Sequence, residues 1–174
     1  MSNWNRIFKP IVVLCAICVV ITGALAATNN VTAPIIEAAT IAAQNAARTE
    51  LLPEAEGAFS PVTGIEVDNV TDIYTADNGT GTVITCEGKG YGGTITVMVA
   101  FVDDTIKQIK ITEQTETAGL GTKIENESFW GSFSGLAAQP FTISDINAIS
   151  GATISSKAVT NAVNAAVEAY NQIP

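Results

Sequence analysis

Residues 94–102 read TITVMVAFV, and this stretch decides the fold. Its bulky apolar side chains recur at every second position: Ile95, Val97, Val99 and Phe101. A period of two predicts a β-strand with one buried face. The glycine-rich segment 89–93 precedes the strand and Asp103-Asp104 follows it, and both are typical turn sequences.

Further strands are expected on both sides of this one. Asp77-Asn78-Gly79-Thr80-Gly81 is a strong hairpin signal, and the spacing of Ile106, Ile109 and Ile111 indicates burial. The remaining strands are expected at 73–75, 82–86 and 105–112. Residues 65–113 therefore predict an antiparallel meander, and with the helices that flank it the fold class is α+β.

The N-terminus carries an apolar run. Pro10 to Ala27 holds eighteen residues without a charge, close to the roughly 20 that a membrane-spanning helix needs. Arg6 and Lys9 precede it, so the positive-inside rule predicts a cytoplasmic segment 1–9 and an outer location for the rest. A cleaved signal peptide is the alternative, because Ala24-Leu25-Ala26 has the pattern of a cleavage site.

Residues 28–64 are expected to form a stalk or packing helix and a linker. A helix is predicted from Pro34, which suits a first turn, to Leu52, since Pro53 ends it. The outer domain then occupies residues 65–174.

A second helix is predicted near the C-terminus, where apolar residues recur at spacings of three and four: Val159, Val163, Val167 and Tyr170. The preceding residues, SGATISS at 150–156, resemble a helix start, with Ser150 as N-cap and Gly151 to Thr153 in the first turn. The unpaired amides and the dipole of a first turn attract phosphate. Lys157, one turn later, could also reach it.

The segment Ile149 to Ser156 resembles the flavinylation motif of FMN-binding domains. In that family a flavin transferase joins FMN to the threonine of the motif through a phosphoester bond, and Thr153 is the matching position. The family usually has Asp three residues before the Ser, where this chain has Asn147, with Asp145 two positions further back.

The segment ETAGLGTKI at 116–124 resembles a loop of the G subunit of Rnf electron-transport complexes and of the C subunit of the sodium-pumping NADH:quinone reductase. Ala118 replaces the usual Pro, and Phe129-Trp130-Gly131 follows where the family carries an aromatic helix. Such a glycine-rich loop lets the backbone approach a flat ligand closely.

The resemblance implies a set of site residues. Thr153 carries covalent FMN, while Thr117, Leu120 and Gly121 border the isoalloxazine ring. The cofactor-binding residues are Glu116, Thr117, Gly119, Leu120, Gly121, Ser150, Gly151, Ala152, Ser156 and Lys157. No residue is assigned a catalytic or metal-binding role.

Composition limits the alternatives. Beyond the apolar run lie all 17 acidic residues, so nucleic acid is an unfavourable partner. The chain has no His, which rules out a c-type haem motif at Cys15 and Cys18. These two cysteines are interpreted as apolar helix residues, and Cys86 has no partner for a disulfide in the outer domain.

The resemblance implies a membrane-anchored relay of electrons in an Rnf-like complex. Such a complex couples electron transfer between ferredoxin and NAD to sodium or proton translocation, and the subunit is not catalytic alone. Its partners would be integral membrane subunits, iron–sulfur or flavin subunits, and a flavin transferase for maturation. Alternatives are a free-standing, membrane-anchored FMN carrier for another reductase, or a pilin-like surface protein. The absence of an acidic residue from the apolar run argues against the pilin.

Overall fold

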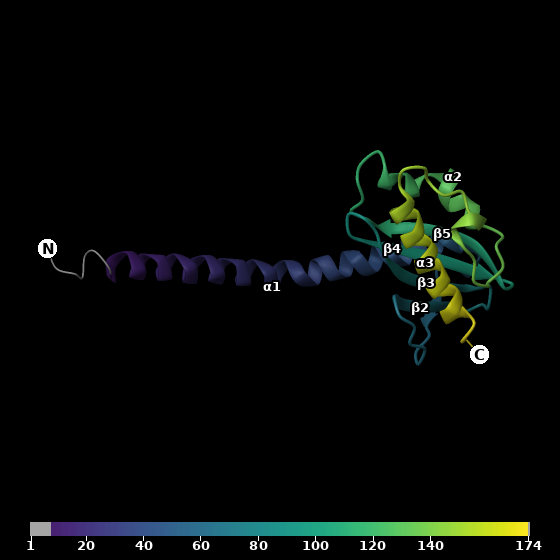
Figure 1. Ribbon diagram of the computed structural model, residues 1–174. Helices are drawn as coiled ribbons and strands as arrows, with labels where there is room; N and C mark the ends of the chain where they lie inside the picture. Colours follow the sequence, from purple (N-terminus) through teal and green to yellow (C-terminus); the bar gives the residue numbers. More distant parts are fainter. Residues whose placement is uncertain (1–7, 174) are drawn as a thin grey trace. The chain divides into compact units, whose positions relative to one another are not determined.

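The computed structural model describes residues 8–173 of the chain (Figure 1). Two compact units meet between Gln44 and Asn45. Helix α1, Lys9–Leu51, makes up the first unit and supplies the first residues of the second. The second unit holds a sheet and the remaining helices. The N-terminal segment 1–9 that was predicted to be cytoplasmic lies mostly outside the described residues, Arg6 included.

Helix α1 is exposed from its first residue, Lys9, to residue 43. Its length and composition fit a helix that crosses a membrane. The prediction that a second helix starts at Pro34 is wrong, because α1 continues through this residue. Proline removes one backbone donor, but apolar helices tolerate that loss where neighbouring groups satisfy the backbone.

The sheet is an antiparallel meander in the order β1-β2-β3-β4-β5, which confirms the predicted fold class. Its strands are β1 Phe59–Pro61, β2 Val70–Ala76, β3 Thr82–Lys89, β4 Thr94–Val102 and β5 Thr105–Glu113. No sequence pattern indicated β1, a three-residue edge strand that ends in Pro61. Proline is tolerated there because one side of an edge strand needs no ladder partner.

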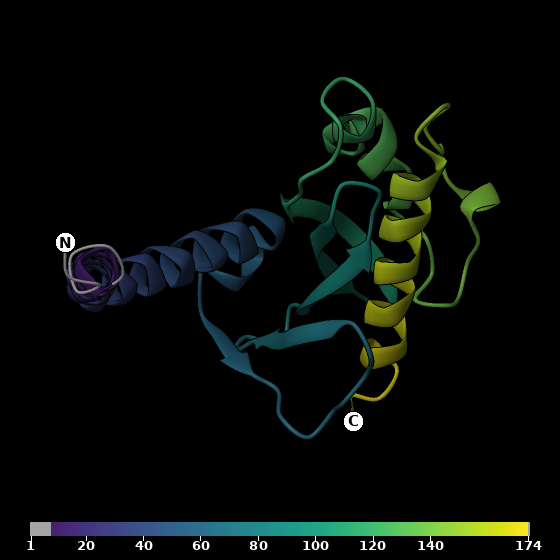
Figure 2. The same cartoon turned by 60° about the vertical axis from the view of Figure 1, so that its left-hand side comes forward.

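Helix α3, Thr153–Tyr170, packs on one face of the sheet against β3 and β4 (Figures 1 and 2). The apolar side chains of β4 on this face are completely buried, as predicted. Ile106 and Ile109 share this face although their spacing is odd, because β5 has one extra residue between them: Phe101 pairs with Ile106, but Ala100 pairs with Gln108. A β-bulge of this kind turns a side chain to the other face.

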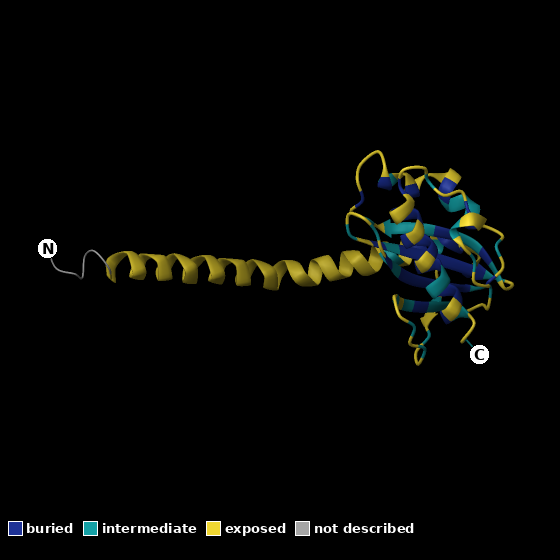
Figure 3. Cartoon of the chain, viewed as in Figure 1, coloured by how far each residue is buried: buried dark blue, intermediate teal, exposed yellow. Residues whose placement is uncertain are grey.

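Most of β4 is coloured as buried in Figure 3. On its other face the two central residues are also buried, whereas the residues toward its ends are exposed or half-buried. Met98 and Ala100 pack there against Leu51 and Leu52, at the end of α1. The prediction of a half-buried strand is therefore wrong for the centre of β4. Alternation could not reveal this, since Met98 and Ala100 are themselves apolar and the helix that covers them lies about fifty residues earlier in the chain.

Several short elements gather near the N-terminal end of α3 (Figures 1 and 2). They are the 3-10 helix η3, Gly121–Glu125, the predicted aromatic helix α2, Glu127–Trp130, and the 3-10 helices η4, Gly131–Phe133, and η5, Ile143–Asp145. Phe129 and Phe133 are buried and meet edge to face, with ring centroids 5.4 Å apart. This packing fixes the loop that runs from β5 to α2 beside the start of α3.

Candidate flavin site

Helix α3 starts later than the sequence indicates. Its first residue is Thr153, Ala152 occupies the N-cap position without a side-chain hydrogen bond, and Gly151 has φ +83°. The prediction of Ser150 as N-cap is therefore wrong. Gly151 adopts a left-handed conformation, which glycine does without strain, and the helix therefore starts two residues later than it would with Ser150 as N-cap.

Ser156 stabilises this turn from within the helix. Its buried hydroxyl accepts a hydrogen bond from the Ile149 amide and donates one to the Ala152 carbonyl, both at 3.1 Å. Thr153 is exposed, whereas Ser155 and Ser156 are buried. The first-turn amides of a helix have no intrahelical partner. The exposed Thr153 hydroxyl therefore stands at the positive end of the α3 dipole.

The predicted loop makes a tight turn. The Leu120 amide donates to the Thr117 carbonyl at 3.1 Å, and Gly119 has φ +75°. The Thr122 hydroxyl accepts from the Gly119 amide at 3.0 Å and closes the turn. Leu120 is thereby held with its side chain 41% exposed.

The loop and the helix start, about thirty residues apart in sequence, are in contact. A Cβ atom on Gly151 would lie 3.3 Å from the Leu120 Cδ1 atom, and one on Gly121 would lie 3.1 Å from the Ser155 Oγ atom. Ser155 Oγ donates to Glu116 Oε2 at 2.5 Å. The two sequence motifs thus form adjoining walls of one site.

These walls border an open cavity of about 500 Å³. It is lined by Tyr91, Glu116, Thr117, Leu120, Gly121, Gly151, Ala152, Thr153, Ile154 and Ser155. Between Leu52 and Ile173, the large apolar side chains that remain exposed are Tyr91, Leu120 and Ile154, and all three belong to this lining. Exposed apolar groups that converge on one cavity are typical of a binding site for a partly apolar ligand.

The structure brings most of the predicted residues together. Those that line the cavity are Glu116, Thr117, Leu120, Gly121, Gly151, Ala152 and Thr153. Four others are not among its lining residues: Gly119, Ser150, Ser156 and Lys157. Gly119 and Ser156 shape the backbone behind the walls, whereas Ser150 and Lys157 are exposed.

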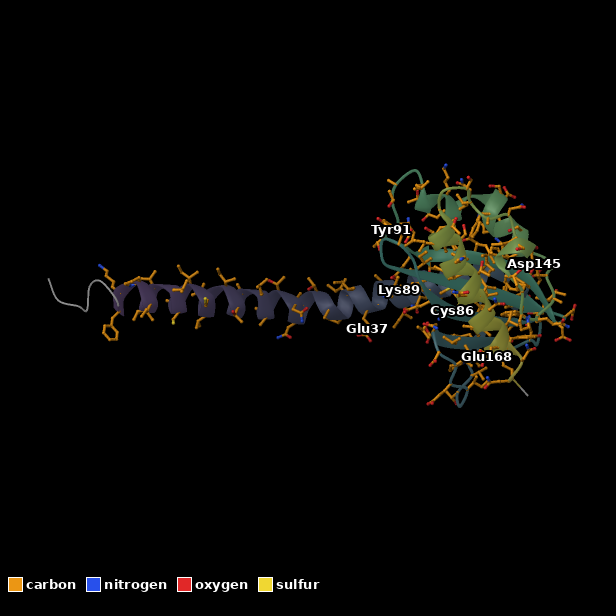
Figure 4. All side chains as sticks on the ribbon, viewed as in Figure 1. Glu37, Cys86, Lys89, Tyr91, Asp145 and Glu168 are labelled. Carbon is orange, nitrogen blue, oxygen red and sulfur yellow. The ribbon has the colours of Figure 1, made fainter. Side chains whose placement is uncertain are left out.

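Three lining residues were not predicted: Tyr91, Ile154 and Ser155. Tyr91 belongs to the turn between β3 and β4, and Figure 4 shows it at the outer end of that turn. The turn approaches the loop closely, since a Cβ atom on Gly92 would lie 2.1 Å from the Thr115 carbonyl oxygen. An aromatic residue between glycines, GYGG at 90–93, was the available signal.

Asn147 holds the segment before the helix start. Its side-chain amide donates to the Ser128 carbonyl at 3.3 Å, and its backbone amide donates to the Ser132 hydroxyl at 3.2 Å. Asp145 instead closes a capping box with Thr142. Hydrogen bonds from the Thr142 backbone amide and hydroxyl lower the pKa of Asp145. The structure thus gives the two residues separate local roles.

Comparison with known proteins identifies this arrangement. The FMN-binding domain family matches residues 90–168, a range that contains every residue of the cavity lining. The G subunit of the proton-translocating ferredoxin:NAD(+) oxidoreductase complex of Clostridium ljungdahlii is 34% identical over 181 residues, which cover 96% of this chain and 93% of the relative. The chain belongs to the family of Rnf complex G subunits.

Two further relatives have the same extent. The G subunit of the ion-translocating oxidoreductase complex of Methanosarcina acetivorans is 34% identical over 97% of this chain and 96% of its own length. The G subunit of the Na(+)-translocating ferredoxin:NAD(+) oxidoreductase complex of Acetobacterium woodii is 32% identical over 98% of this chain and 95% of its own length. The crystal structure of Shewanella oneidensis NqrC is 22% identical, with a TM-score of 0.49 over 66% of each chain.

Membership of this family confirms the predicted FMN-binding domain in the second unit. Together with the length and composition of α1, it also supports a membrane anchor at the N-terminus.

Proposed function

We propose that this chain relays electrons through an FMN that is attached by a phosphoester bond to Thr153, within a membrane complex of the Rnf type. The observation that carries the proposal is the position of Thr153. Among the four hydroxyl residues of the helix start, Ser155 and Ser156 are buried and Ser150 does not line the cavity. Of these four residues, only Thr153 is both exposed and part of the cavity lining.

The cavity fits such a group. Its volume of about 500 Å³ falls within the range of roughly 300–1,000 Å³ for small-molecule sites. Gly121 and Gly151 leave room where a Cβ atom would meet neighbouring side chains. The walls offer apolar side chains for a ring, and the first turn of α3 offers amides for a phosphate.

Two parts of the lining would hold the two parts of FMN. The amides of Thr153 and Ile154 would hold the phosphate. Lys157 follows one turn later in α3, and its positive charge would also attract the phosphate. Thr117, Leu120 and Gly121 would border the ring, with Tyr91 at its edge. When bound, flavin supplies the redox chemistry, because it can exchange one or two electrons.

The role of the protein is then to bind, orient and shield. Leu120 and Ile154 exclude water from the apolar part of the cavity. The covalent bond prevents loss of the cofactor from a site that is open to solvent. No substrate conversion by this chain alone is proposed.

The extent of the relatives supports a subunit of a complex over a free-standing carrier, since the match covers nearly the whole of each chain. By their names, these relatives belong to complexes that translocate protons or Na(+) and couple ferredoxin to NAD(+). The partners proposed for this chain are integral membrane subunits, iron–sulfur or flavin subunits, and the flavin transferase. Co-purification of the tagged chain with membrane subunits supports this; recovery of a flavin-loaded chain alone from native membranes supports a free carrier.

We also propose an orientation for α1, with the N-terminus in the cytoplasm and the FMN-binding domain outside. The basis is the pair Arg6 and Lys9 before the apolar run. Protease added to cells without their wall or outer membrane should digest the domain. Protection in such cells, with digestion in inverted vesicles, would reverse the orientation.

The deciding experiment is the intact mass of the full chain after expression in membranes together with a flavin transferase. A mass increase equal to FMN minus water is expected, and peptide mapping should place it on Thr153. An unmodified chain under these conditions, or an adduct on a different residue, would overturn the assignment.

A further inference from the structure

Glu116 joins the three segments that form the cavity. Its carboxylate is buried, with 8% of the residue exposed. Glu116 Oε2 accepts from the Ser155 hydroxyl at 2.5 Å, and Oε1 accepts from the Gly92 amide at 2.9 Å. Ser155 belongs to the first turn of α3 and Gly92 to the turn between β3 and β4. One side chain therefore ties the loop to both of its neighbours.

The backbone on each side leaves space for this carboxylate. A Cβ atom on Gly90 would lie 2.2 Å from Glu116 Oε1, and one on Gly121 would lie 2.6 Å from Glu116 Oε2. Any other residue at either glycine would displace the carboxylate or the backbone. The close approach of the three segments thus depends on Glu116 and on the two glycines.

The charge of Glu116 has no opposite charge beside it. Within residues 8–173 the ion pairs are Lys107 with Glu54 and Lys110 with Glu50, and neither involves Glu116. An ionised carboxylate only accepts hydrogen bonds, and the Ser155 hydroxyl and the Gly92 amide are both placed to donate. A buried charge without a counter-ion acts strongly on its surroundings, because the local dielectric constant is low.

We propose that Glu116 is a positioning residue that holds the cavity walls together and lowers the reduction potential of the flavin they enclose. This inference rests on the proposed function. A fixed negative charge in the lining disfavours the arrival of electrons on a neighbouring ring, so its removal should make reduction easier. The same carboxylate accepts hydrogen bonds from Gly92 and Ser155. Its removal should therefore also make local opening of these segments more frequent in the flavin-free chain.

The first test measures the potential. The full-length chain, loaded with FMN by the transferase, is compared with Glu116→Gln, which keeps the shape of the side chain and loses its charge. The midpoint potential should rise, with about a tenfold change in the two-electron equilibrium constant, or ~30 mV. The flavin content should stay at the wild-type level.

Two control variants separate charge from structure. Glu113→Gln removes an exposed carboxylate three residues away at the end of β5 and should leave the potential unchanged. Ser155→Ala removes one hydrogen bond but keeps the Glu116 charge, so it should not raise the potential. An unchanged potential in Glu116→Gln, or an equal rise in either control, would overturn the electrostatic role.

The second test uses the flavin-free full-length chain and follows amide hydrogen exchange at Gly92. Glu116→Ala leaves this amide without its acceptor, and exchange should become at least about tenfold faster. If Glu116→Ala does not fold, Ser155→Ala replaces it and should give a smaller acceleration. Wild-type exchange in the folded variant would overturn the role in joining the walls.

The two tests also separate this inference from the proposed function. A wild-type chain that carries no flavin under these conditions refutes the proposed function, and the effect on the potential with it. The exchange measurement still decides whether Glu116 holds the walls.

Discussion

Two sequence motifs predicted the two walls of the cavity, which we call the loop wall (residues 116–121) and the helix wall (residues 150–157). The walls differ in which of their predicted residues line the cavity. In the loop, four of the five predicted residues line the cavity. At the helix start, Gly151, Ala152 and Thr153 line it, while Ser150, Ser156 and Lys157 do not. The five consecutive residues Gly151 to Ser155 all line the cavity, because the turn before α3 and the first turn of α3 both face it. The predicted residues that do not line it precede this stretch or follow it, and Ser156 supports the backbone there.

Both walls are shaped by local hydrogen bonds. In the helix wall Ser156 bonds to Ile149, seven residues away, and in the loop wall the Gly119 amide donates to the Thr122 hydroxyl. The long-range bonds of Glu116, to residues 24 and 39 positions away, join the loop wall to the turn between β3 and β4 and to the helix wall.

The largest effect, loss of the attached FMN, is expected from a substitution of Thr153, the proposed attachment residue in the helix wall. Thr153→Ala should abolish the FMN adduct and leave the domain folded, since the substitution changes helix propensity by only about 0.5 kcal/mol. Intact mass and circular dichroism measure the two results. Ser150→Ala is the matched control and should keep the adduct; an adduct that persists in Thr153→Ala would remove Thr153 from the site.

The next largest effect is expected in the loop wall. Gly121→Ala places a Cβ atom 2.6 Å from Glu116 Oε2 and 2.7 Å from Glu116 Cβ, and overpacking of this kind costs about 1–3 kcal/mol. Chemical denaturation should report the loss, and the flavin absorbance should shift. Gly131→Ala is the control, because its nearest neighbour lies 3.9 Å away. If the two variants were equally stable, the loop wall would accommodate the added methyl group at Gly121 without cost.

A smaller loss is expected behind the helix wall. Ser156→Ala leaves the Ile149 amide without its partner and should cost about 1–2 kcal/mol in unfolding free energy. The exposed Ser144 in η5 provides the control, since Ser144→Ala removes a hydroxyl from the surface. A loss of stability that equals that of the control would show that Ser156 does not support the turn.

The smallest effect is expected at Lys157, which is exposed and lies outside the cavity lining. Lys157→Gln should reduce the stabilisation of the chain by attached FMN by less than about 1 kcal/mol, because exposed charge contacts are weak. Denaturation of the flavin-loaded and flavin-free forms measures this difference. A reduction larger than the effect of Gly121→Ala would assign Lys157 to the phosphate site.

Local patterns predicted most of the sheet correctly. The turn at Asp103-Asp104, for example, has both residues at positive φ, as two-residue hairpin turns of type I′ require. The bulge between Ile106 and Ile109 and the burial of the second face of β4 at its centre were not predicted. The bulge depends on the pairing of β4 with β5, and the burial depends on Leu51 and Leu52 from a distant segment; the alternation of apolar residues encodes neither.

The sequence by itself determined the meander, the C-terminal helix, the apolar N-terminal run and the two motifs of the cavity, because each follows from spacing or from residue type within a short window. The tertiary structure decided that Gly151, and not Ser150, sets the helix start. It also brought Tyr91 and Ser155 to the cavity and gave Glu116 its two partners. These features arise when segments far apart in sequence pack together. The physical cause is the space that glycines leave: Gly90 and Gly121 make room for the Glu116 side chain, and Gly92 lets the backbone approach the Thr115 carbonyl.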